Sequence, residues 1–97
     1  MHARFSGRAR EDLRLIYKYI AEWNPTSVER LTDSILAAIV HLQSFPFLGR
    51  VGRLESTREL VVPGLPYVVV YSLPDQYHVV IERILHGARQ WPPEEAV

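Results

Sequence analysis

The sequence predicts an α+β fold in which an antiparallel helical hairpin packs on one face of an antiparallel sheet. Apolar residues recur at steps of three and four through the first half of the chain, which is typical of amphipathic helices. After Gly52 the period changes to two, and short turns separate the apolar runs, which is typical of strands. The predicted order is strand, helix, helix, strand, strand, strand (βααβββ), in a single domain spanning residues 1–97.

The N-terminal half supplies the first strand and the hairpin. The segment "HARF" (residues 2–5) alternates polar and apolar residues and predicts a short strand, and Ser6 can cap the helix that follows. We expect Asn24 to cap the second helix and Pro25 to lie in its first turn. The predicted apolar stripes contain Ala9, Leu13, Ile16, Ile20 and Trp23 in the first helix, and Val28, Leu31, Ile35, Ala38, Leu42 and Phe45 in the second.

The C-terminal half predicts a three-stranded meander. Its strands are "STRELVV", "YVVVYSL" and "YHVVIERIL" (residues 56–62, 67–73 and 77–85), joined by turns at "PGLP" and "PDQ". Alternation in the last strand predicts one face made of Val79, Ile81, Arg83 and Leu85, and another made of Val80, Glu82, Ile84 and His86. The middle strand is apolar on both faces, so either it is central and buried or its spare face docks a partner.

Composition excludes several classes of protein. A hydrophobic fraction of 47% and a charged fraction of 23% are ordinary for a globular domain, which argues against disorder. There is no cysteine, which excludes disulfides and thiolate metal sites, and no apolar run is long enough to span a bilayer. We therefore expect a cytoplasmic protein without membrane contact. A net charge of +0 lowers the expectation of nucleic-acid binding.

The sequence contains no recognisable catalytic or metal motif. Phosphate-binding loops and zinc-protease signatures are missing, and the four histidines (His2, His41, His78 and His86) show no metal-ligand spacing. We expect neither a metal nor another cofactor. Candidate chemistry therefore rests on arginine, which supplies ten of the 11 basic residues, and on His86.

Arginines concentrate in two segments, "GRVGRLESTREL" and "ERILHGARQW". They could form a basic patch that binds phosphates or an acidic partner, or they could pair internally with Glu55, Glu59 and Glu82. We expect internal pairing more for Arg58 and Arg83, which lie in strands, than for Arg50, Arg53 and Arg89, which lie in loops or the tail. Trp91 is expected to pin the tail onto the domain.

The run "FPFLGRVGRLESTRELVVPGLPYVVVYSL", followed by "VVIERILHGARQWP", resembles the toxins of bacterial type II toxin–antitoxin systems, the RelE/ParE superfamily. The resemblance covers essentially the whole chain. It implies the same fold, a cytoplasmic bacterial setting and a cognate antitoxin whose flexible segment wraps over the toxin. We expect that segment to lie along the helical hairpin or the sheet edge, with apolar anchors and with acidic side chains against arginines.

The superfamily has two branches, and the sequence favours the ParE-like one. Endonuclease members carry an arginine just after an aromatic residue in the third strand, whereas Val68 follows Tyr67 here. The favoured branch implies inhibition of DNA gyrase without catalytic residues. We therefore interpret His86, Arg89, Trp91 and Arg58 as target-binding residues. The alternatives are a ribosome-dependent mRNA endonuclease and a non-toxic relative that binds an antitoxin. The endonuclease would use Arg50, Arg53, Arg83, Arg89 and His86.

Overall fold

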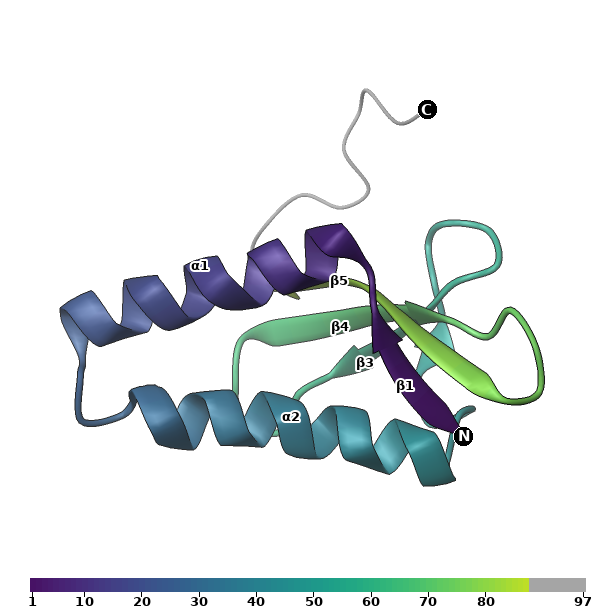
Figure 1. Ribbon diagram of the computed structural model, residues 1–97, viewed down its shortest axis with the longest axis horizontal. Helices are drawn as coiled ribbons and strands as arrows, with labels where there is room; N and C mark the ends of the chain where they lie inside the picture. Colours follow the sequence, from purple (N-terminus) through teal and green to yellow (C-terminus); the bar gives the residue numbers. More distant parts are fainter. Residues whose placement is uncertain (88–97) are drawn as a thin grey trace.

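The computed structural model describes residues 1–87, which form two helices packed on one face of a five-stranded sheet (Figure 1). Helices α1 (Gly7–Trp23) and α2 (Val28–Ser44) run antiparallel across the sheet. The strands are β1 (His2–Phe5), β2 (Arg50–Val51), β3 (Arg58–Val61), β4 (Tyr67–Ser72) and β5 (His78–His86). The predicted α+β fold is confirmed.

The sheet has the strand order β1-β5-β4-β3-β2. Strands β3, β4 and β5 form the predicted antiparallel meander, and β1 adds to it in parallel beside β5. Strand β2 was not predicted. It has only two residues and lies between Gly49 and Gly52, so it shows no hydrophobic period that would reveal it.

The helix boundaries follow local capping. Ser6 caps α1 as predicted, because its side-chain oxygen accepts a hydrogen bond from the Ala9 N–H at 3.0 Å. The expected role of Asn24 is wrong: Asn24 ends α1 by donating its N–H to the Ile20 carbonyl, and Ser27 precedes α2. Pro25 therefore lies in the turn between the helices and not in the first turn of α2. The chain reverses direction through the turn residues 25–27, so α2 begins at Val28.

The main core lies between the helices and the sheet. Its buried residues come from both helical stripes and from β4 and β5, and Ile35, Leu42, Val69, Tyr71 and Ile81 have no exposed surface. The ends of the predicted stripes lie outside it: Trp23 is 74% exposed and Phe45 is 64% exposed. Strand β4 is the central strand and is buried on both faces, so its apolar character needs no partner.

A bulge in β5 overturns the predicted faces of that strand. Val70 pairs with Arg83 and Tyr71 pairs with Ile81, so Glu82 is an extra residue on β5. After Glu82, the side chains of β5 point to the faces opposite to those that simple alternation predicts. Val79, Ile81 and Ile84 all lie in the main core, whereas Leu85 joins Val68 and Val70 in a second buried cluster.

Candidate functional site: arginines on the sheet and a groove between the helices

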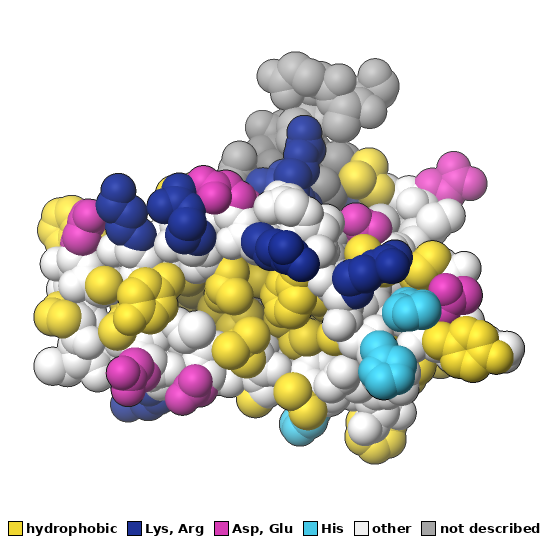
Figure 2. Space-filling model, in the orientation of Figure 1, with side chains coloured by type: hydrophobic (Ala, Val, Ile, Leu, Met, Phe, Trp, Pro, Cys, Tyr) yellow, Lys and Arg dark blue, Asp and Glu magenta, His cyan; other side chains and the backbone are white. Residues whose placement is uncertain are grey.

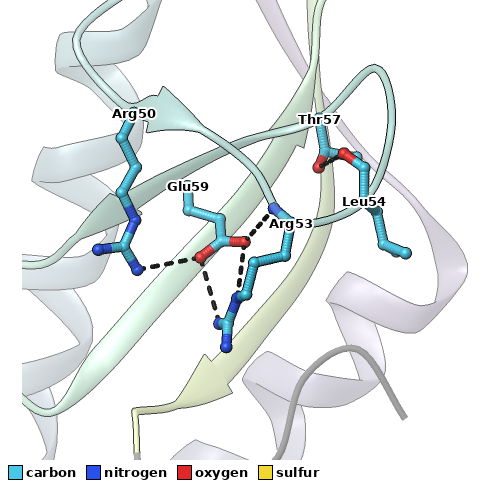
Figure 3. Close-up of polar contacts among 5 residues, drawn as sticks. All are labelled: Arg50, Arg53, Leu54, Thr57 and Glu59. Atoms are coloured by element: carbon cyan, nitrogen blue, oxygen red, sulfur yellow. Dashed lines mark hydrogen bonds and ion pairs between the residues drawn. The ribbon is translucent and has the colours of Figure 1, made fainter. Parts of the chain in front are cut away.

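Glu59 in β3 is the centre of a cluster of arginines (Figure 3). Its carboxylate accepts hydrogen bonds from the Arg50 Nη2 at 3.2 Å, the Arg53 Nη2 at 3.2 Å and the Arg53 backbone N–H at 2.9 Å. The glutamate side chain is fully buried, while those of Arg50 and Arg53 are 64% and 52% exposed. The cluster therefore presents two cations at the surface and hides their counter-charge beneath them.

Electrostatics keep this glutamate ionised. Burial alone raises the pKa of the Glu59 carboxyl, but hydrogen bonds from the Arg53 backbone and from both guanidinium groups outweigh burial and lower the pKa below its ordinary value. Two guanidinium groups share one carboxylate, which leaves a local charge of about +1.

Asp12 in α1 holds another arginine, Arg83 of β5. The Arg83 Nε lies 2.7 Å from Asp12 Oδ2, and the Arg83 Nη2 lies 3.0 Å from Asp12 Oδ1. The Ile84 backbone N–H also donates to Asp12 Oδ2 at 3.0 Å. These hydrogen bonds raise the pKa of the Arg83 guanidinium above its ordinary value, so it stays charged. Both side chains are mostly buried, and the pair connects the first helix to the last strand.

Arg58 in β3 is held differently. Its Nη1 donates to the Gly49 carbonyl at 2.6 Å, and its guanidinium lies over the Phe47 ring, 5.0 Å from the ring centre. In the part of the chain that the structure describes, no carboxylate lies at ion-pair distance from Arg58.

His86 ends β5 and packs edge-on against Tyr67, with the ring centres 5.6 Å apart. Burial raises the pKa of the Tyr67 hydroxyl, so Tyr67 is neutral at physiological pH. Both residues line a cavity of about 460 Å³ between α1 and the ends of β4 and β5. Its other lining residues are Asp12, Leu15, Ile16, Tyr19, Pro66 and Ile84.

The structure separates the candidate target-binding residues. His86 pairs with Tyr67 at one end of β4, and Arg58 pairs with Tyr71 near the other end. Arg89 and Trp91 lie outside the described residues. The expectation that Arg50 and Arg53 are less paired than Arg58 is wrong: both are held by Glu59, because a buried carboxylate needs counter-charges from its neighbours. The expected pairing of Arg83 is confirmed, but with Asp12.

Sequence reasoning missed Asp12, although a signal for it exists. Asp12 is three residues after Ala9 and four before Ile16, so it lies on the buried stripe of α1. A carboxylate at such a position indicates a buried partner, but nothing local identifies Arg83 as that partner.

A groove between the two helices was also missed. It has a volume of about 480 Å³ and is lined by Phe5, Arg10, Leu13, Arg14, Tyr17, Thr32 and Leu36. Figure 2 shows hydrophobic side chains gathered between the helices, with Lys and Arg side chains along α1. Arg14 is paired with Glu11 at 2.6 Å, whereas no described carboxylate lies at ion-pair distance from Arg10. The groove is therefore apolar at its floor and basic along one rim.

The described residues offer no metal centre, since no three or more His, Asp or Glu side chains among residues 1–87 could hold an ion together. Within the same residues, neither helix has the length and apolar character needed to cross a bilayer.

Comparison with known proteins gives consistent matches along the chain. A family model described as the ParE toxin of the type II toxin–antitoxin system parDE matches residues 3–91. A candidate toxin of Sinorhizobium fredii, Y4kP, is 34% identical over 89 residues, covering 92% of this chain and 91% of the relative. Toxin RelE2 of Caulobacter vibrioides is 35% identical over 82 residues, covering 84% of this chain and 90% of the relative.

A solved structure shares the fold. It comes from the chromosomal ParDE toxin–antitoxin system of P. aeruginosa and superposes with a TM-score of 0.79 at 20% identity. The match covers 89% of this chain and 95% of that chain.

Proposed function

The chain belongs to the ParE toxin family of type II toxin–antitoxin systems, and we propose that it arrests bacterial growth by inhibiting DNA gyrase. One observation carries the choice of gyrase over RNA cleavage. Arg50, Arg53 and Arg83, which a nuclease would use, are held by buried or mostly buried carboxylates of the same chain. Guanidinium groups that are held on carboxylates of their own chain, with part of their charge neutralised there, are less available to stabilise a phosphate transition state.

Val68 supports the same choice. By the resemblance to the superfamily, an endonuclease would be expected to carry an arginine at this position, whereas Val68 is part of a buried cluster with Val70 and Leu85. We assign target binding to His86, Arg58, Arg89 and Trp91, the last two beyond the described residues, and we place the protein in the cytoplasm, where gyrase acts.

The test of this function is a supercoiling assay with purified gyrase and purified toxin. We expect loss of supercoiling together with trapped, cleaved DNA, and growth arrest when the toxin is induced in cells. Supercoiling that is unaffected at saturating toxin would contradict the proposal. If mRNA is instead cut in the ribosomal A site, and the cuts disappear on Arg89→Ala, the chain is an endonuclease. Induction without growth arrest would identify a non-toxic relative.

We further propose that a cognate antitoxin neutralises the toxin by laying an amphipathic segment in the groove between the helices. The apolar floor fits the anchors of a helix or extended peptide, and Arg10 fits an acidic side chain on its polar face. A ligand that binds only the folded toxin also stabilises it, so co-expression should raise its melting temperature.

A charge placed on the groove floor tests this site. Leu36 is partly exposed and lines the groove, so Leu36→Glu should lower antitoxin affinity by about 30-fold or more without loss of folding. Val61→Glu is the matched control, because Val61 is also an exposed aliphatic residue, lies on β3 and does not line the groove. For the titration we expect the antitoxin to be encoded by a short reading frame next to the toxin gene, and its product is the ligand to purify. Equal affinities for the two variants would exclude the groove.

A further inference from the structure

The connection from α2 to β2, together with β2 itself, exposes an unusual number of large apolar side chains. Phe47 and Val51 are 71% and 77% exposed, and Phe45 and Leu48 are also more than half exposed. We call these four residues and Arg58 the edge patch. Single exposed apolar residues are normal on a protein surface, but four within seven consecutive residues are typical of a docking surface.

The backbone of this segment is held in place by the buried side chain of Tyr71 in β4. The Tyr71 hydroxyl accepts a hydrogen bond from the Gly49 N–H at 2.9 Å and donates one to the Pro46 carbonyl at 2.8 Å. Burial raises the pKa of Tyr71, so this hydroxyl remains a donor. A Cβ at Gly49 would lie 2.7 Å from the Tyr71 ring, so the close approach requires glycine. A patch held in this way loses little conformational freedom when it binds.

The chemistry of the edge patch indicates what it binds. Val51 pairs with Arg58 in the sheet, so the two side chains are neighbours on one face, and the Arg58 guanidinium covers the Phe47 ring. Aromatic residues and arginine are the types that contribute most energy to protein interfaces. Because no described carboxylate pairs with Arg58, a complementary surface is apolar and carries an Asp or Glu.

Two other occupants fit less well. A second copy docked about a two-fold axis would bring Arg50 and Arg58 toward the same arginines of its partner, which like-charge repulsion disfavours. A nucleic acid would gain little from Leu48 and Val51, and the neighbouring Arg50 and Arg53 already share the Glu59 carboxylate.

We infer that the edge patch is the surface through which this toxin binds a carboxylate-bearing apolar segment of DNA gyrase. The inference rests on the proposed function and gives the target a second contact besides His86. Strands β1 and β2 are the two edges of the sheet, separated by four strand spacings or about 19 Å. The helix groove is lined by Phe5 of β1, whereas Val51 and Arg58 lie in β2 and β3, so separate proteins can occupy the two surfaces.

The experiment compares supercoiling inhibition by the full-length toxin and its variants. Phe47→Ala, Val51→Ser and Arg58→Glu should each raise the toxin concentration needed for half-inhibition by about 10-fold or more. Tyr77→Ala is the matched control, because Tyr77 is an exposed aromatic residue whose carbonyl accepts the His2 N–H of β1, the sheet edge opposite β2, and it should leave inhibition unchanged. Antitoxin affinity, measured by calorimetry, should stay within about twofold for Phe47→Ala and Val51→Ser, which also verifies folding.

Each alternative gives a distinct result. If wild-type toxin does not inhibit gyrase, the proposed function is wrong and the assignment of the patch falls with it. If wild-type toxin inhibits gyrase and the Phe47 and Val51 variants inhibit equally well, only the patch is excluded. Equal losses in antitoxin affinity would assign the patch to the antitoxin. Loss of binding to a DNA duplex without gyrase would assign it to nucleic acid. Either result overturns the inference.

Discussion

Asp12 and Glu59 are the two charged residues that are buried in the described part of the chain, and both hold arginines. Asp12 pairs with a single arginine that is itself mostly buried, and it also accepts the backbone N–H of Ile84. Glu59 pairs with two arginines whose side chains remain mostly exposed, and it accepts the backbone N–H of Arg53.

The difference lies in which partner is in contact with water. At Asp12 both charges are mostly removed from solvent, so the ion pair replaces hydration that both have lost, and it joins residues 71 positions apart. At Glu59 only the carboxylate depends on its partners, because the guanidinium groups can return to water. The same residue types therefore stabilise the fold in one place and orient a surface loop in the other.

Removing the Asp12 carboxylate should lower the free energy of unfolding more than any other substitution at these two sites. Asp12→Ala removes the mostly buried carboxylate that accepts hydrogen bonds from the Arg83 guanidinium and the Ile84 N–H, and we expect the free energy of unfolding to fall by about 3–4 kcal/mol. Urea denaturation measures this. Glu11→Ala is the control, because Glu11 is the preceding residue and the side chains of its pair with Arg14 are mostly exposed; it should unfold like the wild type. A loss below about 1 kcal/mol for Asp12→Ala would show that the pair is dispensable.

Glu59→Gln should be less costly, because its partners are exposed. The amide oxygen can still accept the Arg53 N–H, but the ion pairs are lost, so we expect about 2 kcal/mol of destabilisation. Amide hydrogen exchange should accelerate at Arg53 and change little at Ile84. A loss as large as that of Asp12→Ala would mean that the two carboxylates are energetically equivalent and would remove the distinction.

The same contrast shows what could be predicted from the sequence. The apolar periods gave both helices and the meander, because those periods are local. Strand β2 and the bulge at Glu82 could not be found: a two-residue strand has no period, and a bulge interrupts alternation without a local signal.

The pairing of the arginines was the least predictable part of the site. The sequence predicts less internal pairing for Arg50 and Arg53 because they lie in a predicted loop, yet the buried Glu59 carboxylate of β3 binds both guanidinium groups. Such pairing depends on tertiary burial, which the loop sequence does not encode. The resemblance to the RelE/ParE superfamily, by contrast, depends on the order of several short motifs and is confirmed.

Lowering the pH should remove the contribution of Glu59 to the free energy of unfolding. Its folded pKa lies below the ordinary value of 4.5, so its contribution to stability is fully present above that pH and is lost as the pH falls through the folded value. The stability difference between wild type and Glu59→Gln should therefore be constant near neutral pH and shrink below about pH 4.5. Chemical denaturation from pH 7 to pH 3 measures it. A difference that grows on acidification would have the wrong sign for this mechanism.

The smallest effects concern the two arginines on Glu59, which can substitute for each other. Arg50→Ala or Arg53→Ala alone leaves one guanidinium on the carboxylate, so each should cost less than about 1 kcal/mol after screening by solvent. The double variant leaves a buried carboxylate with only the Arg53 backbone N–H, and it should lose about 0.5–1 kcal/mol more than the sum of the single variants. Strictly additive stability losses would show that Arg50 and Arg53 do not substitute for each other at Glu59. Since an exposed pair weakens with salt and a buried carboxylate without partners does not, the excess should also persist in 0.5 M NaCl.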